Sequence, residues 1–305
     1  MTGLPYRTLS VDLRERFGRR VQKIALDAGL TCPHRGHDNR GGCIYCNASG
    51  SGTGAHARGL DLSGQIDEQM LLMRRRYRAE AFIAYFQSFS NTYAPVDVLR
   101  SIYDTVLPYP DIVGLAIGTR PDCIDRERLD LIAGYASKRL VWIEYGLQSA
   151  SDETLRRINR GHDVQSFVDA VNLTAHYTVR RCAHVIIGLP GEGMGDYLRT
   201  ARLVSSLPVT DVKIHLLYVV RGTPMEDMLL QGSYRPLTME EYAEATARFI
   251  GHLRDDIVIQ RITGDPHADE LVGPRWALEK ARVRAAILAR MSEAGITQGS
   301  LVGEP

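Results

Sequence analysis

Three of the five cysteines of this chain stand close together, at positions 32, 43 and 46. Their spacing is C-x10-C-x2-C, and an aromatic residue, Tyr45, directly precedes the last one. Iron–sulfur cubanes are normally held by four thiolates, so three in one loop would leave one iron with an open coordination site. Neighbouring glycines would let the backbone bend round such a bulky group and direct N–H groups at its sulfur atoms. They are Gly36, Gly41, Gly42, Gly50, Gly52 and Gly54.

Two other interpretations of the same loop stay open. His34 and His37 lie within it, so zinc bound by three cysteines and one histidine is chemically feasible, although zinc sites usually bring their ligands as two tight pairs. The cysteines could also be ordinary reduced thiols, because an odd and unevenly placed set argues against a secreted disulfide framework. Cys123 and Cys182 stand alone and are expected to be small core residues.

Short β-rich runs recur along the chain, each followed by a polar or helix-like stretch. Six are expected to be strands, over residues 23–27, 82–86, 113–118, 141–146, 183–188 and 212–219. Between them, apolar residues at helical spacing, such as Ile66, Met70, Met73 and Tyr77, predict helices. This alternation indicates right-handed βαβ units and a parallel sheet. Six units are too few for a complete eight-stranded barrel, so we predict an α/β fold, a partial (β/α)6 TIM-type barrel.

The remaining segments are expected to flank this barrel. Residues 1–20 form a lead-in, residues 21–222 the partial barrel, and residues 223–305 a mainly helical C-terminal extension packed on the barrel. In the extension, Thr238-x-x-Glu241 is a capping box that opens a helix, and the pattern over residues 275–291 predicts another.

Composition limits the partners and the location. The formal net charge is +1, so the field of the whole molecule makes no case for a polyanionic partner. The N-terminus has no apolar signal core, and no apolar run approaches the roughly 20 residues of a membrane-spanning helix. A cytoplasmic protein without a membrane partner is expected.

Polar residues inside the expected barrel are candidates for chemistry. In a parallel α/β barrel the loops after the strand C-termini form the active face. Glu144 lies inside an apolar strand, where burial without a partner is costly, so it serves a cofactor or substrate or pairs with Arg120. Lys213 and His215 alternate along the sixth strand and would point into the barrel, for substrate or for a buried ion pair with Glu144. The candidate catalytic residues are Glu144, Lys213 and His215.

Eight motifs along the chain carry a resemblance to a known family. They are "GGCIYCN", "AYFQSFSNTYAP", "GLAIGTRPDC", "WIEYGLQSA", "INRGH", "IIGLPGE", "KIHLLYVVRGTP" and "RITGD". Together they resemble the radical S-adenosylmethionine (SAM) superfamily, and within it the YhcC-like branch, relatives of the elongator catalytic subunit and the oxygen-independent coproporphyrinogen oxidase. The superfamily motif is C-x3-C-x-aromatic-C. This chain keeps the C-x-Tyr-C ending and has the longer first gap that is typical of the branch.

This resemblance implies a cofactor set and an activity. Cys32, Cys43 and Cys46 would ligate one [4Fe–4S] cluster whose open iron chelates SAM. Reductive cleavage of SAM would give a 5′-deoxyadenosyl radical that abstracts a hydrogen atom from the substrate. The electron would come from a flavodoxin- or ferredoxin-type donor. The protein itself would place the reactants and exclude water and oxygen.

The resemblance also implies which side chains contact SAM. They are Gln87, Ser88, Thr119, Arg120, Gln148, Arg160, His184 and Gly188. Two positions depart from the family pattern. Gln87-Ser88 stands where relatives carry a Gly-Gly-Glu-type turn, and His184 stands where relatives have Asp.

The substrate is the least determined feature. Relatives include enzymes that act on tRNA, among them the wobble-uridine-modifying elongator subunit, so the resemblance implies tRNA modification. The basic run from Arg74 to Arg78 and the basic residues after Lys280 would either contact RNA phosphates or form solvated helix surfaces. Two alternatives are a radical SAM enzyme for a small metabolite or peptide, and a non-catalytic zinc-binding scaffold.

Overall fold

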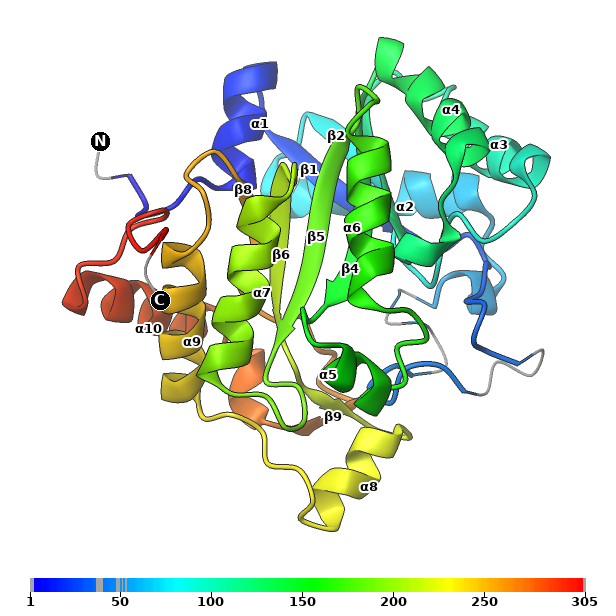
Figure 1. The fold of residues 1–305 in the computed structure, drawn as a ribbon. Coiled ribbons are helices and arrows are strands. Elements are labelled where there is room, and N and C mark those ends of the chain that lie inside the picture. The colour runs from blue at the N-terminus through cyan, green and yellow to red at the C-terminus, as the bar shows by residue number, and fades with distance from the viewer. Residues whose placement is uncertain (1–2, 37–40, 48–49, 51, 53, 304–305) are drawn as a thin grey trace.

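The computed structural model of the protein describes residues 3–36, 41–47, 50, 52 and 54–303. Within them, seven strands form one curled sheet in the order β1-β2-β3-β4-β5-β6-β8, and every neighbouring pair is parallel (Figure 1). This confirms the expected partial barrel. The strands are β1 (Val21–Leu26), β2 (Ala81–Phe86), β3 (Ile112–Thr119), β4 (Leu140–Gln148), β5 (Arg180–Ile187), β6 (Asp211–Leu216) and β8 (Val258–Arg261).

Ten α-helices lie in the described ranges. They are α1 (Leu9–Phe17), α2 (Leu62–Tyr77), α3 (Val96–Asp104), α4 (Arg126–Gly134), α5 (Asp152–Arg157), α6 (Val164–Thr174), α7 (Met194–Ser206), α8 (Pro224–Leu230), α9 (Met239–Gly251) and α10 (Lys280–Glu293). Those that connect the strands, such as α2 and α6, cover the outer face of the sheet. Short 3-10 turns occur at His56–Arg58, Pro121–Cys123, Tyr135–Ser137 and Arg275–Leu278. Outward-facing Ile24, Phe86 and Tyr145 share one core with Ile66 of α2 and Phe167 of α6. None of the helices in the described ranges combines the length and apolar character needed to cross a bilayer.

A seventh strand extends the sheet beyond the six that the sequence predicted. β8 pairs in parallel with β6, with Lys213 opposite Arg261, and the connection between them contains α8 and α9. β8 has only four residues, two of them polar, so its sequence pattern does not indicate a strand. Residues after 222 therefore supply a barrel strand as well as helices, and the domain boundaries stay a prediction.

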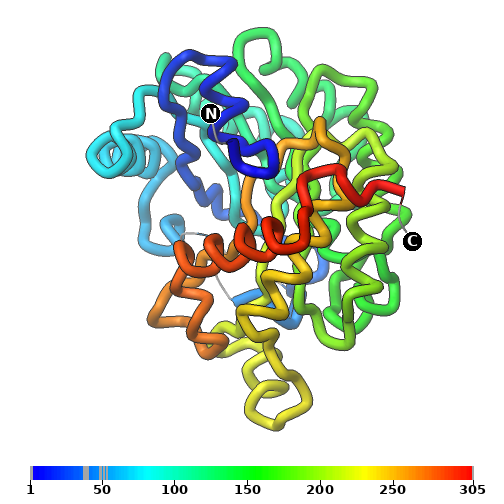
Figure 2. Tube along the Cα trace, turned by 90° about the vertical axis from the view of Figure 1, so that its left-hand side faces the viewer, coloured from blue at the N-terminus to red at the C-terminus, as the bar shows by residue number. Residues whose placement is uncertain are grey.

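The C-terminal segment also confirms two expected helices. The capping box at the start of α9 is present, with Thr238 Oγ1 accepting from the Glu241 N–H at 3.1 Å. The pattern over residues 275–291 becomes a 3-10 turn followed by α10, which packs against α9 (Figure 2). A two-stranded antiparallel sheet, β7 (Val219–Val220) with β9 (Leu271–Gly273), lies at the end of the barrel where α8 protrudes.

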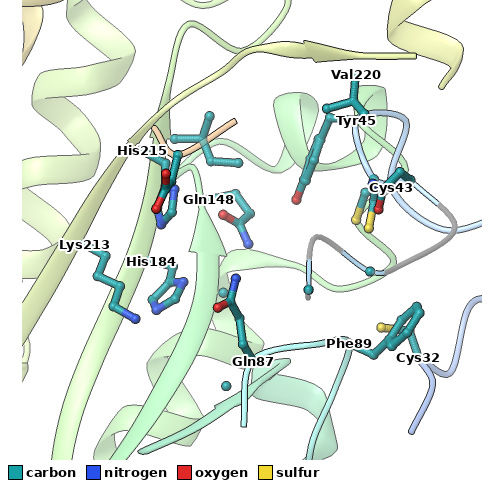
Figure 3. A pocket seen from close by; sticks show the side chains of 18 of the residues that line it. Cys32, Cys43, Tyr45, Gln87, Phe89, Gln148, His184, Lys213, His215 and Val220 are labelled. Carbon is teal, nitrogen blue, oxygen red and sulfur yellow. The ribbon is translucent and has the colours of Figure 1, made fainter. Parts of the chain in front are cut away.

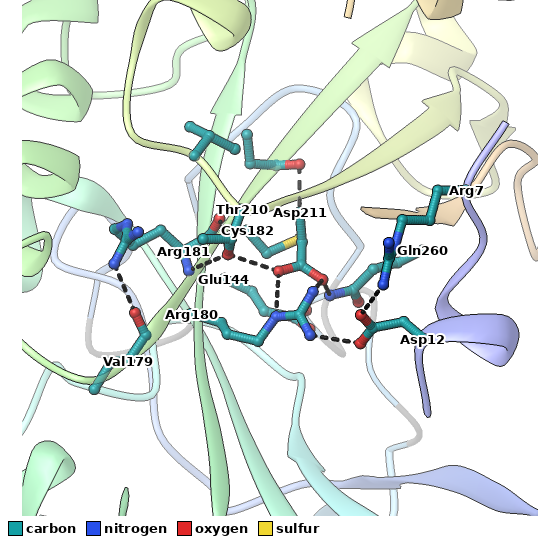
Figure 4. Close-up of polar contacts among 12 residues, drawn as sticks. Arg7, Asp12, Glu144, Val179, Arg180, Arg181, Cys182, Thr210, Asp211 and Gln260 are labelled. Atoms are coloured by element: carbon teal, nitrogen blue, oxygen red, sulfur yellow. Dashed lines mark hydrogen bonds and ion pairs between the residues drawn. The ribbon is translucent and has the colours of Figure 1, made fainter. Parts of the chain in front are cut away.

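The N-terminal end of the barrel is filled by side chains. Leu13 of α1 packs there with Ile83 and Trp142 from the inner face of the sheet. Next to them, Arg180 donates to both carboxylate oxygens of Asp211, at 2.8 and 2.9 Å, and to Asp12 of α1 at 2.6 Å (Figure 4). Because this end is plugged, ligands reach the interior from the C-terminal ends of the strands.

The two edges of the sheet are joined inside the barrel. Lys23 Nζ on β1 donates to Gln260 Oε1 on β8 at 2.7 Å, and Gln260 donates in turn to Asp211 at 3.0 Å. Thr8, just before α1, forms a parallel bridge with Ile259 of β8. The sheet is therefore curled far enough for its first and last strands to share side-chain contacts.

Candidate active site

A cavity of about 390 Å³ lies at the C-terminal ends of the strands. It joins the cysteine loop to the polar interior of the barrel, and side chains of both line it (Figure 3). Twelve of the fourteen predicted site residues line this cavity, and Ser88 and Gly188 do not. The twelve are Cys32, Cys43, Cys46, Gln87, Thr119, Arg120, Glu144, Gln148, Arg160, His184, Lys213 and His215.

Glu144 is the centre of the cavity floor. Its carboxylate is completely buried, and it accepts from the ammonium groups of Lys23 and Lys213 and from His184 Nε2 at 2.9 Å. Burial alone would raise the pKa of Glu144, but the charges of Lys213 and Lys23 outweigh it and hold the pKa well below its ordinary value. The carboxylate is therefore ionised, and its partners are the two lysines rather than Arg120.

Three basic side chains around Glu144 also have pKa values below their ordinary range. Burial lowers the pKa of Lys213 to about 7, although the Glu144 carboxylate opposes this. Burial lowers the pKa of His184 to about 4 and that of His215 well below its ordinary value. The two imidazole rings lie close to each other, with centroids 5.6 Å apart. At neutral pH both are uncharged and offer hydrogen bonds to a ligand without adding charge.

Cys43 lies at the wall opposite this floor in a positively charged environment. Its Sγ is 3.6 Å from Arg160 Nη1 and 3.6 Å from His34 Nε2. Burial raises the pKa of Cys43, but the Arg160 charge and hydrogen bonds from His34 and Tyr45 outweigh it and lower the pKa to about 6. Cys43 is therefore poised as a thiolate, the form that binds metals.

The other two cysteines face the same cavity. Cys32 Sγ lies 3.4 Å from Ser90 Oγ, and the Cys46 N–H donates to the Cys43 carbonyl at 3.0 Å. Burial raises the pKa of Cys32, so its thiolate depends on the charge of a bound metal. His37, the second histidine considered as a zinc ligand, lies outside the described residues.

The distances among the cysteine sulfur atoms distinguish a site for an iron–sulfur cluster from a site for a single metal ion. Tetrahedral zinc has Zn–S bonds of about 2.3 Å and would gather its sulfur ligands within roughly 4 Å of one another. In the described part of the chain, the three cysteines do not form a set of ligand atoms all within 4.8 Å of one another. In Figure 3, Cys32 lies apart from Cys43. Thiolates bound to three different irons of a cubane stand wider apart, so the loop fits a cluster better than zinc.

A different trio, Glu144, Cys182 and His184, does have its ligand atoms within 4.8 Å. Glu144 is already neutralised by two lysines, and those charges would repel a cation. Burial, with the Glu144 charge, also keeps the pKa of Cys182 well above its ordinary value. This trio is therefore part of an ion-pair network.

Comparison with known proteins identifies the family. The profile of the radical SAM superfamily matches residues 31–204, and that of the radical SAM C-terminal domain matches residues 209–293. This chain belongs to the radical SAM superfamily. The superfamily match begins one residue before Cys32 and includes every predicted cysteine ligand.

Relatives matched over most of their length support the same placement, and one solved structure shares the fold. YtqA of Bacillus subtilis is 38% identical over 295 residues, which cover 96% of this chain and 92% of that protein. YhcC of Escherichia coli is 35% identical over 296 residues, covering 96% of this chain and 94% of that protein. Elp3 of the archaeon Methanocaldococcus infernus shares the fold, with a TM-score of 0.71 at 15% identity. The match covers 92% of this chain and 64% of that one.

Membership of the radical SAM superfamily makes the chain an enzyme whose cofactors are a [4Fe–4S] cluster and SAM. The alternative of a non-catalytic zinc scaffold is therefore wrong, in agreement with the spread of the cysteine sulfurs. The YhcC-like resemblance that the motifs indicated is confirmed. Which side chains contact each cofactor stays a prediction.

Two of the side chains expected to contact SAM, Arg120 and Thr119, form hydrogen bonds with neighbouring groups. Arg120 donates to the carbonyls of Arg160 and Gly161 at 2.8 Å each and to Asp122 at 2.6 and 2.8 Å. It therefore positions the segment that carries Arg160. Thr119 Oγ1 lies 2.6 Å from Thr92 Oγ1.

Two residues of the radical SAM site escaped sequence analysis. Lys23 neutralises Glu144, and Arg261 lines the cavity from β8. Lys23 is a charged residue inside an expected strand, the same signal that singled out Glu144. Arg261 belongs to the "RITGD" motif, but the strand that directs it inward was not predicted.

Proposed function

We propose that this radical SAM enzyme modifies tRNA, by abstracting a hydrogen atom from the side chain of a wobble uridine. The observation that carries the proposal is the single cavity that joins the three cysteines to the Glu144–Lys213–His215 floor. When bound, the reduced cluster supplies the electron that cleaves SAM to a 5′-deoxyadenosyl radical. A cytoplasmic location and an electron donor of flavodoxin or ferredoxin type belong to the same proposal.

The residues on the two opposite sides of the cavity have different proposed roles. Cys32, Cys43 and Cys46 hold the cluster, and Arg160 places a positive charge 3.6 Å from the Cys43 sulfur. On the opposite wall, Glu144 and Lys213 with His215 bind and orient the substrate. Gln148, which also lines the cavity, and His184, beside Glu144, are proposed to contact the cofactor.

Support for tRNA comes from the resemblance to the elongator catalytic subunit and from the shared fold with archaeal Elp3. The basic run from Arg74 to Arg78 does not lead RNA to the cavity. It ends α2 and precedes β2, so it lies at the N-terminal end of the barrel, away from the cysteines. The phosphate contacts of the substrate are therefore expected elsewhere.

A second candidate is a radical SAM enzyme for a small metabolite or peptide. The cavity volume of about 390 Å³ favours it, because it lies within the range of roughly 300–1,000 Å³ of small-molecule sites. The two candidates share the chemistry and differ in what enters the open end.

The enzymatic part of the proposal is tested on protein purified without oxygen. Wild-type protein is expected to bind about four irons and to release 5′-deoxyadenosine when dithionite and SAM are added. Cys43→Ala is expected to lose iron and cleavage together, whereas the control Cys182→Ala, a buried thiol in the barrel interior, retains both. Stoichiometric zinc in place of iron, or no 5′-deoxyadenosine from the wild type, would contradict the proposal.

The substrate is tested in cells. Nucleosides of bulk tRNA from a deletion strain and its parent are compared by mass spectrometry, with complementation by the wild type and by Cys43→Ala. A precursor of a modified uridine is expected to accumulate in the deletion strain and to be consumed only with the wild-type gene. Identical nucleoside profiles would reject tRNA and favour the second candidate.

A further inference from the structure

Two polar side chains on the cavity wall have no hydrogen-bond partner within the described ranges. Arg261 is the last residue of β8, and its guanidinium forms neither a hydrogen bond nor an ion pair there. His215 on β6 forms no hydrogen bond, although its ring lies beside that of His184. Arginine with five donors and no partner in a partly buried position is unusual.

The sheet register brings these two side chains together. Arg261 stands opposite Lys213 on the neighbouring strand, and His215 follows Lys213 by two residues on the same face. Both line the cavity. In Figure 3, His215 and Lys213 lie on the opposite side of the pocket from Cys43 and Cys32.

Nearby acidic groups do not neutralise Arg261. Glu144 is shared by Lys23 and Lys213, and Asp211 is bound by Arg180. At the mouth, Asp265 pairs with Lys280, and Glu270 accepts from Asn47 at 3.1 Å. Both histidines of the floor are uncharged, and the charge of Arg261 has no acidic partner among the described residues. An unpaired charge in a partly buried position is unfavourable.

The structure assigns to Arg261 and His215 a binding site for an oxyanion of the substrate, a carboxylate or a phosphate group. The planar fork of arginine fits either group with two parallel hydrogen bonds, and a neutral imidazole donates a third. This inference rests on the proposed function in one respect, that the substrate occupies this cavity.

The site is distinct from the cofactor end of the cavity. The guanidinium next to the cysteines is that of Arg160, 3.6 Å from Cys43 Sγ. Arg261 comes from the far edge of the sheet and faces the cavity beside Lys213 and His215. The oxyanion is therefore carried by the substrate, and it fixes the distance between the reacting carbon and the cysteine loop.

The test uses the full-length, cluster-loaded protein and two probes, inorganic phosphate and acetate. The midpoint of thermal unfolding is measured against the concentration of each probe, with sodium chloride keeping the ionic strength constant. We expect one or both probes to raise the midpoint in a saturable way. A response to phosphate alone indicates a phosphorylated substrate group, and a response to acetate alone indicates a carboxylate.

Matched variants test whether the probes bind at Arg261 and His215. Arg261→Gln is expected to weaken the binding of the active probe at least tenfold, and His215→Asn to weaken it less. Arg261→Lys keeps the charge and is expected to retain part of the affinity, which shows that loss in Arg261→Gln is not misfolding. The control Arg282→Gln removes an exposed arginine that is paired with Glu279, and it is expected to leave the response unchanged.

Two outcomes would overturn the site. In the first, the unfolding midpoint of the wild-type protein depends only on ionic strength and not on which probe is added. In the second, the probes raise the midpoint of Arg261→Gln as much as that of the wild type. Cleavage of SAM by the wild type is measured on the same samples. A protein that cleaves SAM without a specific anion response loses only this inference, whereas anion binding without SAM cleavage contradicts the proposed function and leaves the site standing.

Discussion

At the scale of single residues, Glu144 illustrates how a buried charge is tolerated. Its two lysine partners come from β1 and β6, and its histidine partner comes from β5. Each ion paid a desolvation cost on burial, so the network is stable only while all of its members are present.

Glu144→Gln is therefore expected to be strongly destabilising. It leaves Lys23 and Lys213 without a countercharge, and breaking a buried pair in this way costs about 3–5 kcal/mol. The free energy of unfolding in urea measures the loss. Glu153→Gln removes an exposed partner of Arg157 and is expected to cost less than about 1 kcal/mol. Equal losses in the two variants would show that the buried network contributes nothing special.

His184 makes stability depend on pH. Its pKa is about 4 in the folded protein and about 6.5 when unfolded, so between these values the unfolded state binds a proton that the folded state does not. The free energy of unfolding is therefore expected to decrease as the pH falls from about 6.5 towards 4. His184→Gln lacks this contribution, and its slope is expected to be shallower by up to about 1.4 kcal/mol per pH unit. Parallel slopes in the two proteins would refute the assignment.

At the scale of elements, β4 shows how closely a strand is fitted to the residues around it. A Cβ at Gly146 would lie 2.4 Å from Arg160 Nη2 and 2.5 Å from Gln148 Nε2. The Arg160 guanidinium also donates to the Gly146 carbonyl at 2.8 Å and contacts Cys43. The absence of a side chain on the strand thus sets the position of a charge next to the cysteines.

Gly146→Ala is expected to displace Arg160 and to lower the iron content of the anaerobically purified protein. Gly195, near the start of α7, has no atom within 4 Å of an added Cβ. Gly195→Ala is therefore expected to keep its iron and to gain about 0.4–1 kcal/mol of stability. Iron per chain and the unfolding free energy of both variants test this. Full iron in Gly146→Ala would mean that the position of Arg160 does not matter for the cluster.

At the scale of the whole molecule, the two ends of the barrel have different roles. One end is plugged by α1 and the Asp12–Arg180–Asp211 network (Figure 4), and the other carries the cavity (Figure 3). The end of α2, with its run of arginines, belongs to the plugged end. A charged side chain can contact a substrate in the cavity only if it lies at the end of the barrel that carries the cavity.

The double variant Arg75→Gln/Arg76→Gln is expected to leave tRNA modification unchanged. Both side chains are exposed at the N-terminal end of the barrel, and neither lines the cavity. Nucleoside analysis of a complemented deletion strain is the measurement. A loss of modification as complete as in Cys43→Ala would show that RNA contacts the protein far from the cavity.

The sequence by itself determined the local features. Alternating apolar runs located six strands, and the Thr238–Glu241 capping box located the start of α9. The clustered cysteines, with the motifs that follow each strand, indicated the radical SAM superfamily. These features depend on residues that are near one another along the chain, so a pattern can reveal them.

Only the tertiary structure decided which side chains meet inside the barrel. Lys23 and Arg261 lie on the first and last strands of the sheet, and no local pattern relates Lys23 to Glu144 or Arg261 to Lys213. Pairing across the sheet depends on how strongly the sheet curls and on the register of each strand, which are set by packing over the whole chain. For the same reason the sequence left both Arg120 and Lys213 as alternative partners of Glu144, and the fold paired it with Lys213 and with Lys23, which the sequence had not indicated.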